Sequence, residues 1–402
     1  MRKRVQTYHY YILASILVGG LFGGCTEPFS PDLLPLTENT LVVDATLTNE
    51  SKIHEVLLSR SSAEPGVFQI EPSATVKITD DNQQIFTFSE TEPGKYLSDL
   101  PFKADTGRTY QLQITTTDGK SYTSKAESLS QTSQIENVAT KKTITDNGNE
   151  GVLITVDSFD PTGNSTYYKY EYEETYKIIA PRWSPNELVV LSEEDMTVNV
   201  VRRDPDKEEQ TCYATDKSIS IILTKTSGAS EDRVTDFTVR FLNKDNFIIS
   251  HRYSILVKQY VLSQQAYTFY EKLKDFSGSE NLFSQSQPGF INGNIFVDDG
   301  SDNRVVGFFE VSSVSEKRIF FNYADLFPDS DLPPFIDECN PANFLVDGNS
   351  SIFPFVKSNG VSYITDVTDP DTGALKEYIV VPRVCGDCTV LGNATVPDFW
   401  EE

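Results

Sequence analysis

The sequence predicts a mostly β protein, in which an immunoglobulin- or fibronectin-like β-sandwich is followed by a larger β-rich region with one amphipathic helix. Three observations support this fold class. From residue 41 onward, apolar residues mostly recur with the period of two that is typical of half-buried strands. Turn signals separate these runs, and seven runs fit into about 90 residues, which is the strand spacing of such a sandwich. One later segment has the period of a helix instead.

The N-terminal segment is predicted to be a lipoprotein signal peptide, residues 1–24. A basic start, residues 1–4, precedes an apolar run, residues 10–22, and two small residues lead to Cys25. The apolar run is too short to span a bilayer as a helix. A Cys at this place is typical of a bacterial lipoprotein, in which the signal is cut before the Cys and its thiol carries diacylglycerol. We therefore expect Cys25 to be lipidated; the alternative is a plain secretory signal with a chance Cys.

A tether and the first sandwich are predicted to follow the signal. Residues 25–40 contain three prolines, and this density favours extended chain. Residues 41–128 hold the seven short strands of the immunoglobulin- or fibronectin-like domain. Tyr110, after a Gly-containing turn, fits a tyrosine corner, in which the Tyr hydroxyl bonds back to the backbone of the preceding loop.

The remaining residues, 129–402, are predicted to form one or more β-rich domains. A long strand at residues 166–178 places Tyr168, Tyr170 and Tyr172 on one face. Such an aromatic stripe could stack on a glycan or a peptide. The alternative, which the pattern favours, is a sheet face that a neighbouring layer covers.

One helix is expected at residues 263–277. Ser263 can cap its first turn, and Gly278 suits the position just after its end. Four apolar residues recur with helical spacing and form one stripe, which we expect to pack on a sheet: Ala266, Phe269, Tyr270 and Leu273.

Composition excludes several functions. The formal net charge of −25 argues against nucleic acid, because phosphate binding requires a basic surface. Only three His are present, and the two that follow the signal, His54 and His251, have no motif around them. The sequence contains no recognisable catalytic or phosphate-binding motif. We therefore expect a protein that is not an enzyme and has no cofactor.

Acidic loops offer one possible ion ligand. Asp298, Asp299 and Asp302 lie in one loop between predicted strands, and Asp369 and Asp371 lie in another. Clustered carboxylates with Gly turns suit calcium, a hard cation that prefers several oxygen ligands. The alternative, which we favour, is that Asp and Gly form tight turns at a solvated edge.

Four cysteines remain after Cys25: Cys212, Cys339, Cys385 and Cys388. An even number in an exported chain favours structural disulfides. Four cysteines allow three pairings, and the sequence does not choose among them. A redox pair within the C-x-x-C or a zinc site is the alternative.

Several motifs, in their order along the chain, resemble the Bacteroidota outer-membrane lipoprotein family catalogued as domain of unknown function 4249. Cys25 and the four later cysteines are part of this resemblance. The other motifs are Leu41-Val42-Val43, Thr211-Cys212-Tyr213, Ser230-Glu231-Asp232-Arg233, Gln287-Pro288-Gly289, Asn292-Gly293-Asn294-Ile295, Val306-Gly307-Phe308-Phe309, Lys317-Arg318-Ile319-Phe320, Cys385-Gly386-Asp387-Cys388 and Pro397-Asp398-Phe399-Trp400. The resemblance implies a lipid-anchored, mostly β protein, often encoded beside a TonB-dependent transporter. It carries over no catalytic residue.

From this resemblance we expect an outer-membrane lipoprotein that faces the cell surface and serves as a non-enzymatic accessory partner of a TonB-dependent transporter in nutrient uptake. Two alternatives stay open. One is a free-standing surface lipoprotein that binds a glycan or peptide, and the other is a structural or assembly factor of the cell envelope.

Overall fold

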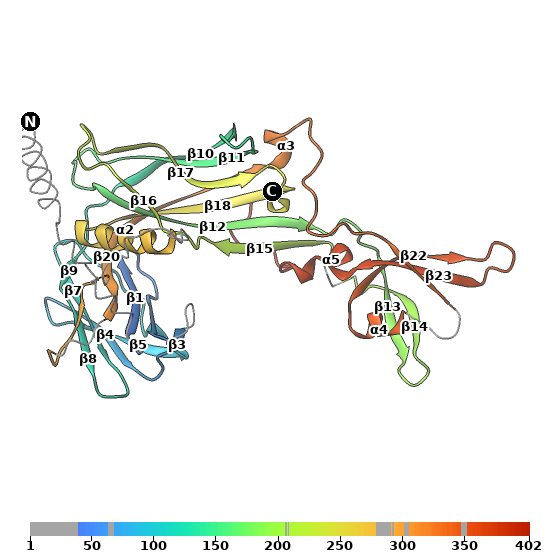
Figure 1. Cartoon of the computed structure of the whole chain (residues 1–402), viewed down its shortest axis with the longest axis horizontal. Coiled ribbons are helices and arrows are strands. Elements are labelled where there is room, and N and C mark those ends of the chain that lie inside the picture. Colours follow the sequence, from blue (N-terminus) through green and yellow to red (C-terminus); the bar gives the residue numbers. More distant parts are fainter. Residues whose placement is uncertain are drawn as a thin grey trace, which may run out of the picture.

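A computed structural model describes residues 39–62, 68–205, 207, 209–278, 291, 293–300, 305–346 and 352–402. Strands account for 52% and helices for 9% of the structure, so the predicted mostly β class is confirmed. Two β bodies lie at one end of an elongated outline, and a narrower lobe extends from them at the other end (Figure 1). Within the described ranges, no helix is long and apolar enough to cross a membrane. The predicted signal, tether and Cys25 lie outside these ranges.

The first body is one sheet that encloses a core of alternating apolar side chains, among them Leu47, Tyr96 and Leu112. The hydrogen-bonded order is β20-β1-β2-β6-β5-β4-β7-β8-β19. Its strands are β1 (Leu41–Thr48), β2 (Glu55–Ser61), β3 (Phe68–Ile70), β4 (Thr75–Asp80), β5 (Ile85–Glu92), β6 (Lys95–Ser98), β7 (Thr109–Thr115), β8 (Ser121–Ser124), β9 (Glu127–Ser128), β19 (Ile295–Val297) and the first half of β20 (Val305–Asn322).

Two details of this body relate to the sequence predictions. The hydroxyl of Tyr110 accepts a hydrogen bond from the backbone N–H of Asp105 at 2.8 Å, as a tyrosine corner requires. The expected boundary at residue 128 differs from the structure, because β19 pairs with β8 and β20 pairs with β1. Residues 41–128 are therefore completed by strands that lie much later in the chain.

Strand β20 belongs to both bodies. Its first eight residues, from Val305 to Ser312, pair in parallel with β1. Its remaining residues, from Ser313 to Asn322, pair antiparallel with β18 (Arg252–Val261). One continuous backbone thus crosses from the first body to the second, and hydrogen bonds hold it on both sides.

The second body has two layers around a large apolar core. One layer is the three-stranded sheet β10-β11-β17, and the other contains β15, β12, β18, β16 and the second half of β20. The bounds are β10 (Gln134–Ile144), β11 (Glu150–Phe159), β12 (Tyr167–Ile179), β15 (Thr211–Lys217), β16 (Ile222–Lys225), β17 (Arg233–Asn243) and the 3-10 turn η2 (Phe247–Ile249).

Helix α2 (Gln264–Gly278) covers the outer face of the second layer, beside the first body (Figure 1). The hydroxyl of Ser263 accepts a hydrogen bond from the N–H of Ala266 at 3.1 Å, so the predicted cap is present. Ala266 and Phe269 are buried against Tyr260 and Phe308 in the packed cluster beneath the helix. The stripe predicted from the sequence therefore packs on a sheet, as expected.

The distal lobe combines two distant parts of the chain, residues 181–205 and 339–390. Its small core lies among a hairpin, a three-stranded sheet and a short helix. These elements are β13 (Asn186–Ser192), β14 (Thr197–Arg202), β21 (Ala342–Leu345), α4 (Phe353–Lys357), β22 (Val361–Thr368), β23 (Leu375–Pro382), α5 (Arg383–Gly386) and η3 (Cys388–Val390); α3 (Tyr323–Leu326) lies before the lobe, after β20.

The C-terminal residues return to the second body. The indole ring of Trp400 lies 4.9 Å from the ring of Tyr213 and 5.8 Å from the ring of Phe320, measured between centroids. The Lys177 ammonium pairs with the Glu402 carboxylate at 3.0 Å. The closing Pro-Asp-Phe-Trp motif therefore fastens the end of the chain to the outer face of this sheet.

Candidate functional site

The tyrosine stripe is in the core and does not form an exposed stacking face. Tyr168 and Tyr170 are fully buried, and Tyr172 is 9% exposed. The Tyr168 hydroxyl donates to Asp232 at 2.8 Å, and the Tyr170 hydroxyl donates to Gln259 at 2.8 Å. The ligand-binding interpretation is thus corrected, because the β10-β11-β17 sheet covers this face.

The acidic loops form tight turns. One carboxylate oxygen of Asp369 accepts hydrogen bonds from the N–H of Asp371 at 3.0 Å and of Thr372 at 2.9 Å, and the other oxygen pairs with Lys376 at 3.0 Å. These contacts, led by the Thr372 N–H, lower the pKa of Asp369 to about 2.

In the other loop, Asp298 accepts a hydrogen bond from the Thr123 hydroxyl at 3.0 Å. Asp299 also has an interaction partner, and Asp302 lies outside the described residues. Asp369 and Asp298 thus satisfy donors of their own loop or of a neighbouring strand, as expected for turns. Calcium binding at either loop stays a prediction.

The four cysteines that follow Cys25 form two disulfides at the base of the distal lobe. Cys212 of β15 bonds to Cys388, and Cys339 bonds to Cys385, with 5.6 Å between the Cα atoms in each pair. All four side chains are buried. The C-x-x-C therefore does not bridge itself, and its sulfurs are not free thiolates for zinc. The first bond fastens the lobe to the second body.

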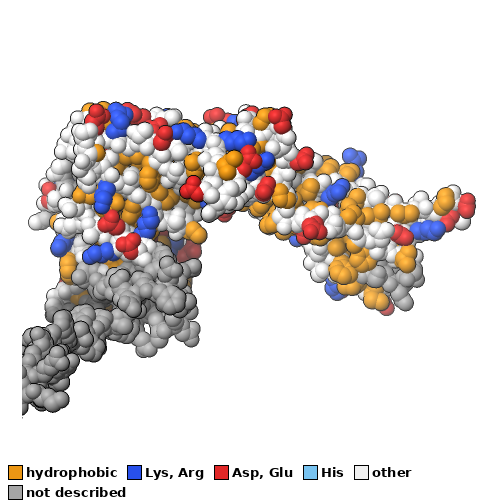
Figure 2. Space-filling view, turned by 45° about the horizontal axis from the view of Figure 1, so that its top comes forward, with side chains coloured by type: hydrophobic (Ala, Val, Ile, Leu, Met, Phe, Trp, Pro, Cys, Tyr) orange, Lys and Arg blue, Asp and Glu red, His pale blue; other side chains and the backbone are white. Residues whose placement is uncertain are grey.

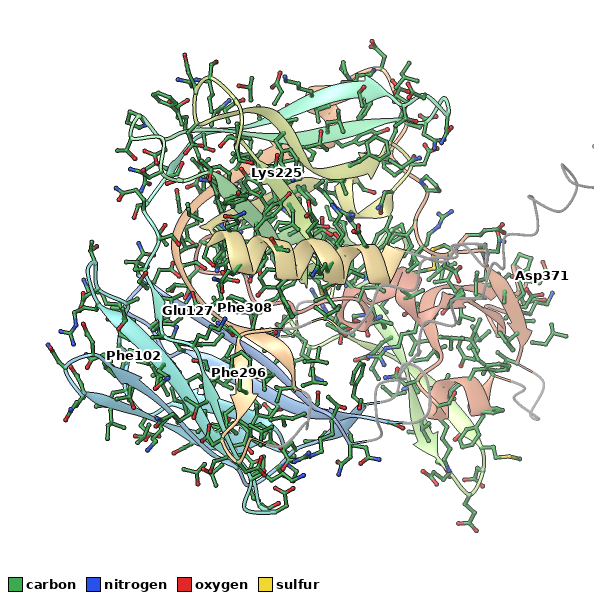
Figure 3. All side chains as sticks on the ribbon, turned by 60° about the vertical axis from the view of Figure 1, so that its left-hand side comes forward. Phe102, Glu127, Lys225, Phe296, Phe308 and Asp371 are labelled. Atoms are coloured by element: carbon green, nitrogen blue, oxygen red, sulfur yellow. A yellow bond between two sulfur atoms is a disulfide. The ribbon has the colours of Figure 1, made fainter. Side chains whose placement is uncertain are left out.

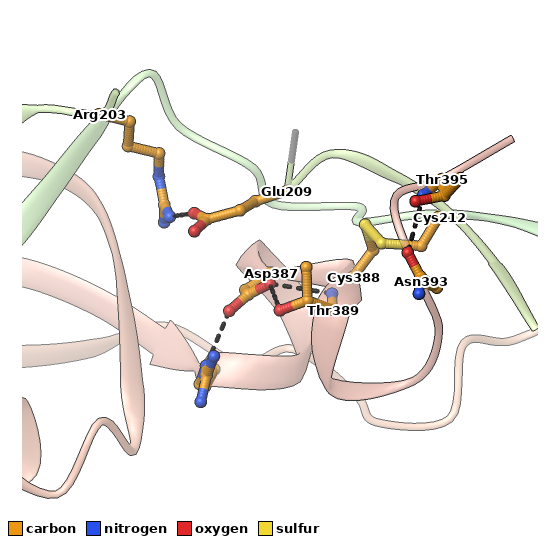
Figure 4. The surroundings of a disulfide bond; sticks show 9 residues. Arg203, Glu209, Cys212, Asp387, Cys388, Thr389, Asn393 and Thr395 are labelled. Carbon is orange, nitrogen blue, oxygen red and sulfur yellow. Dashed lines mark hydrogen bonds and ion pairs between the residues drawn. A yellow bond between two sulfur atoms is a disulfide. The ribbon is translucent and has the colours of Figure 1, made fainter. Parts of the chain in front are cut away.

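A polar network holds the turn between Cys385 and Cys388 (Figure 4). Asp387 accepts from the Thr389 N–H at 2.9 Å and from the Arg383 guanidinium at 2.7 Å. Burial opposes the charge of Asp387, but these hydrogen bonds outweigh it and lower the Asp387 pKa. The Asp of this motif thus acts as a helix cap beside the disulfide.

The distal lobe exposes more apolar surface than its small core requires. Its exposed apolar side chains include five that are between 38% and 69% exposed. We call this set the distal apolar surface, and it consists of Leu191, Met196, Leu345, Phe355 and Val367. Orange apolar atoms are prominent on the narrow arm in Figure 2. Large contiguous apolar patches are typical of surfaces that contact other proteins, whereas singly exposed apolar residues are ordinary.

Two elements bring part of this surface together. Helix α4, which carries Phe355, packs against β13 and β14 around the core of the lobe. The Lys357 ammonium pairs with Glu193 in the hairpin turn at 2.8 Å. The tip of the hairpin, with Leu191 and Met196, therefore lies near the helix. Sequence reasoning missed this surface, although the run Leu188-Val189-Val190-Leu191 has apolar residues on both faces of a strand.

A buried ion pair lies where the two bodies meet under helix α2. The Lys169 ammonium of β12 is 3.0 Å from the Glu310 carboxylate of β20, and both side chains are buried. The same ammonium lies 4.8 Å from the ring centroid of Tyr260 and 4.5 Å from that of Tyr270. Glu171, at the edge of the cluster, is 3.4 Å from the ammonium.

Electrostatics favours the charged form of Lys169. Burial alone would lower the pKa of this amine, but the attraction of Glu310 outweighs burial and raises the pKa well above its ordinary value. Burial and the Glu310 charge raise the pKa of the neighbouring Tyr270 hydroxyl. The cluster therefore holds Lys169 as a fixed cation between the bodies.

These features define a mostly β, two-disulfide protein with a β20 strand shared by two bodies. The chain belongs to the family described as domain of unknown function (DUF4249), whose model matches residues 26–318. The matched region ends within β20, so the later C-terminal motifs lie beyond it.

Comparison with other proteins adds little. No curated protein matches the sequence. Among solved structures, a trypsin-activated alpha-2-macroglobulin from Escherichia coli is similar over 57% of this chain and 15% of its own, with 11% identity and a TM-score of 0.16. The chain thus spans a small part of that protein, and the likeness carries no argument.

Proposed function

We propose that this protein is a lipid-anchored, non-enzymatic accessory protein of the outer membrane that partners a TonB-dependent transporter in nutrient uptake and faces the cell surface. The distal apolar surface is the observation that carries the proposal. It lies at the opposite end of the elongated molecule from β1, where the described chain begins (Figure 1). An anchor attached before β1 leaves that surface free to reach a neighbouring protein.

The two disulfides support export and a rigid lobe. Disulfides persist in oxidising compartments and are rare in reducing ones. A lobe that is tied to the second body loses little conformational freedom when a partner binds, and this preserves affinity. No role in catalysis follows from the buried Lys169 cluster, which acts as a structural contact between the bodies.

Co-purification tests the partnership. The tagged protein is extracted from its own cells in mild detergent, and transporter subunits are identified in the eluate by mass spectrometry. We expect a transporter with the wild type, and its loss with Phe355→Asp and Leu191→Asp. Ile219→Asp is the matched control, because Ile219 is a fully exposed apolar residue outside the lobe. Recovery of the wild type alone would favour a free-standing binder or an envelope factor.

Fatty-acid labelling tests the anchor separately. Cells are grown with an alkyne-tagged palmitate, and the label on the purified protein is read by in-gel fluorescence. We expect labelled wild type and unlabelled Cys25→Ala. Label that persists in the variant would contradict lipidation at this residue.

A further inference from the structure

A cavity of about 330 Å³ lies between helix α2 and the first body. Figure 3 shows Phe308 beneath the helix, on the side of the first body, with Glu127 close by. Residues from α2, from the segment after β8 and from around β20 line the cavity: Gln264, Gln265, Thr268, Phe269, Lys272, Lys125, Gly293 and Phe308. This volume lies at the lower end of the range that is typical of small-molecule sites.

The cavity is locally cationic in a strongly acidic protein. Lys125 and Lys272 are both exposed, and in the described part of the chain neither forms an ion pair. The Lys125 ammonium instead lies 5.7 Å from the ring centroid of Phe296. The first turn of α2 adds a positive helix end, because Gln264 and Gln265 line the same space. These groups favour a ligand that carries a negative charge.

The nearby carboxylates do not line the cavity. Glu127 accepts a hydrogen bond from the Asn294 amide at 2.8 Å; burial raises the pKa of Glu127, and the charge of Lys125 opposes part of that rise. Glu310 is engaged by Lys169 at 3.0 Å. Lys125 and Lys272 are thus the charged residues that line the cavity itself.

The remaining lining suits hydroxyl groups and a carbon skeleton. Gln264 and Gln265 are exposed and offer amide donors and acceptors. The Thr268 hydroxyl donates to the Gln264 carbonyl at 2.9 Å and keeps its lone pairs free to accept. The rings of Phe269 and Phe308 have centroids 5.6 Å apart and are each 5% exposed, so their exposed edges form the apolar floor of the cavity.

We propose that this cavity binds a sugar acid of monosaccharide size, of the hexuronate class. Its carboxylate pairs with Lys125 and Lys272, its hydroxyls bond to the two glutamines and Thr268, and its carbon face contacts the apolar floor. This combination of groups discriminates against a neutral sugar through the cations, and against a simple carboxylate through the hydroxyl contacts. The site is independent of the distal apolar surface.

Calorimetric titration of the whole mature protein with sodium D-glucuronate tests the proposal, with D-glucose and acetate as matched ligands. We expect saturable glucuronate binding, and binding of the other two at least about tenfold weaker. Raising salt from about 50 to about 500 mM weakens the binding, because both lysines are exposed.

Variants locate the site. Lys125→Met and Lys272→Met each weaken glucuronate binding by about tenfold, since each removes a charge-assisted contact. Lys217→Met is the control, because Lys217 is an exposed lysine of β15 outside the cavity. Absence of binding up to about 20 mM, equal binding of glucose, or unchanged affinity in both cavity variants overturns the proposal. None of these results changes the transporter co-purification, so the two proposals fail separately.

Discussion

Replacement of Lys169 by Met should destabilise the contact between the two bodies. The side chain keeps its length, but the cation that faces Glu310 is lost. Glu310 is 1% exposed, and apart from Lys169 its carboxylate accepts hydrogen bonds from the hydroxyls of Ser312 and Tyr270. A buried carboxylate that has lost its counter-ion is costly because water does not solvate its charge.

The size of the effect follows from the geometry. At a separation of 3.0 Å, an effective dielectric constant of about 20 gives an attraction of about 5 to 6 kcal/mol. The rings of Tyr260 and Tyr270 each add about 1 kcal/mol of cation–π attraction. Much of this sum offsets the cost of burying both ions, so the pair itself contributes little net stability. Removal of one partner leaves the other charge buried without its counter-ion, and we expect the free energy of unfolding to fall by about 3 to 5 kcal/mol.

A double-mutant cycle measures this effect by guanidinium chloride unfolding. Lys169→Met alone should lower the unfolding midpoint strongly, whereas Lys169→Met combined with Glu310→Gln should recover most of the loss. Lys177→Met is the control on the same strand, because its pair with Glu402 is largely exposed and should contribute less than about 1 kcal/mol. The reasoning would be refuted if Lys169→Met lowered the free energy of unfolding no more than Lys177→Met does. Additive effects of Lys169→Met and Glu310→Gln in the double variant would refute it as well.

Three further predictions concern stability. The partners of the two disulfides are 176 and 46 residues apart, so in the chain-entropy model their reduction should lower the free energy of unfolding by up to about 5 and about 4 kcal/mol, respectively. Thermal unfolding with and without dithiothreitol measures this loss, and an unchanged midpoint would contradict it. Burial lowers the pKa of His54 in the folded protein. The contribution of neutral His54 to the free energy of unfolding is therefore complete above the ordinary histidine pKa of about 6.5, and it is lost as the pH falls from that value toward the folded-state pKa. His54→Gln should flatten the pH dependence of the unfolding midpoint in that window, and an equal slope in both proteins would argue against it. Gly307→Ala should cost about 1 to 3 kcal/mol or more, because the new Cβ would lie 2.2 Å from the Val43 carbonyl oxygen, whereas Gly360→Ala should be nearly neutral in the same assay.

Local patterns in the sequence predicted local structure well. Alternating apolar residues predicted the strands, since a half-buried strand exposes every second side chain. Ser263 marked the start of α2, and Tyr110 marked a turn that its own hydroxyl closes. Each of these features depends on residues that are close in the chain, and so a single sequence contains the whole signal.

The candidate sites were predicted less well. Alternation placed Tyr168, Tyr170 and Tyr172 on one face, but a strand looks the same whether that face is open or covered. Only the packing of β10-β11-β17 decides that the rings are buried. The distal apolar surface was missed for a related reason, because exposure depends on how few elements surround the lobe.

The sequence by itself determined the β class, the positions of most strands and α2, the number of cysteines and the family. The tertiary structure decided which cysteines pair, which body β20 completes, and where charge is buried. Lys169 and Glu310 are 141 residues apart, and nothing near either residue indicates its partner. Local periodicity indicates which face of a segment is buried, but it does not indicate which other segment covers that face. These contacts form only when segments that are distant in the sequence pack against each other.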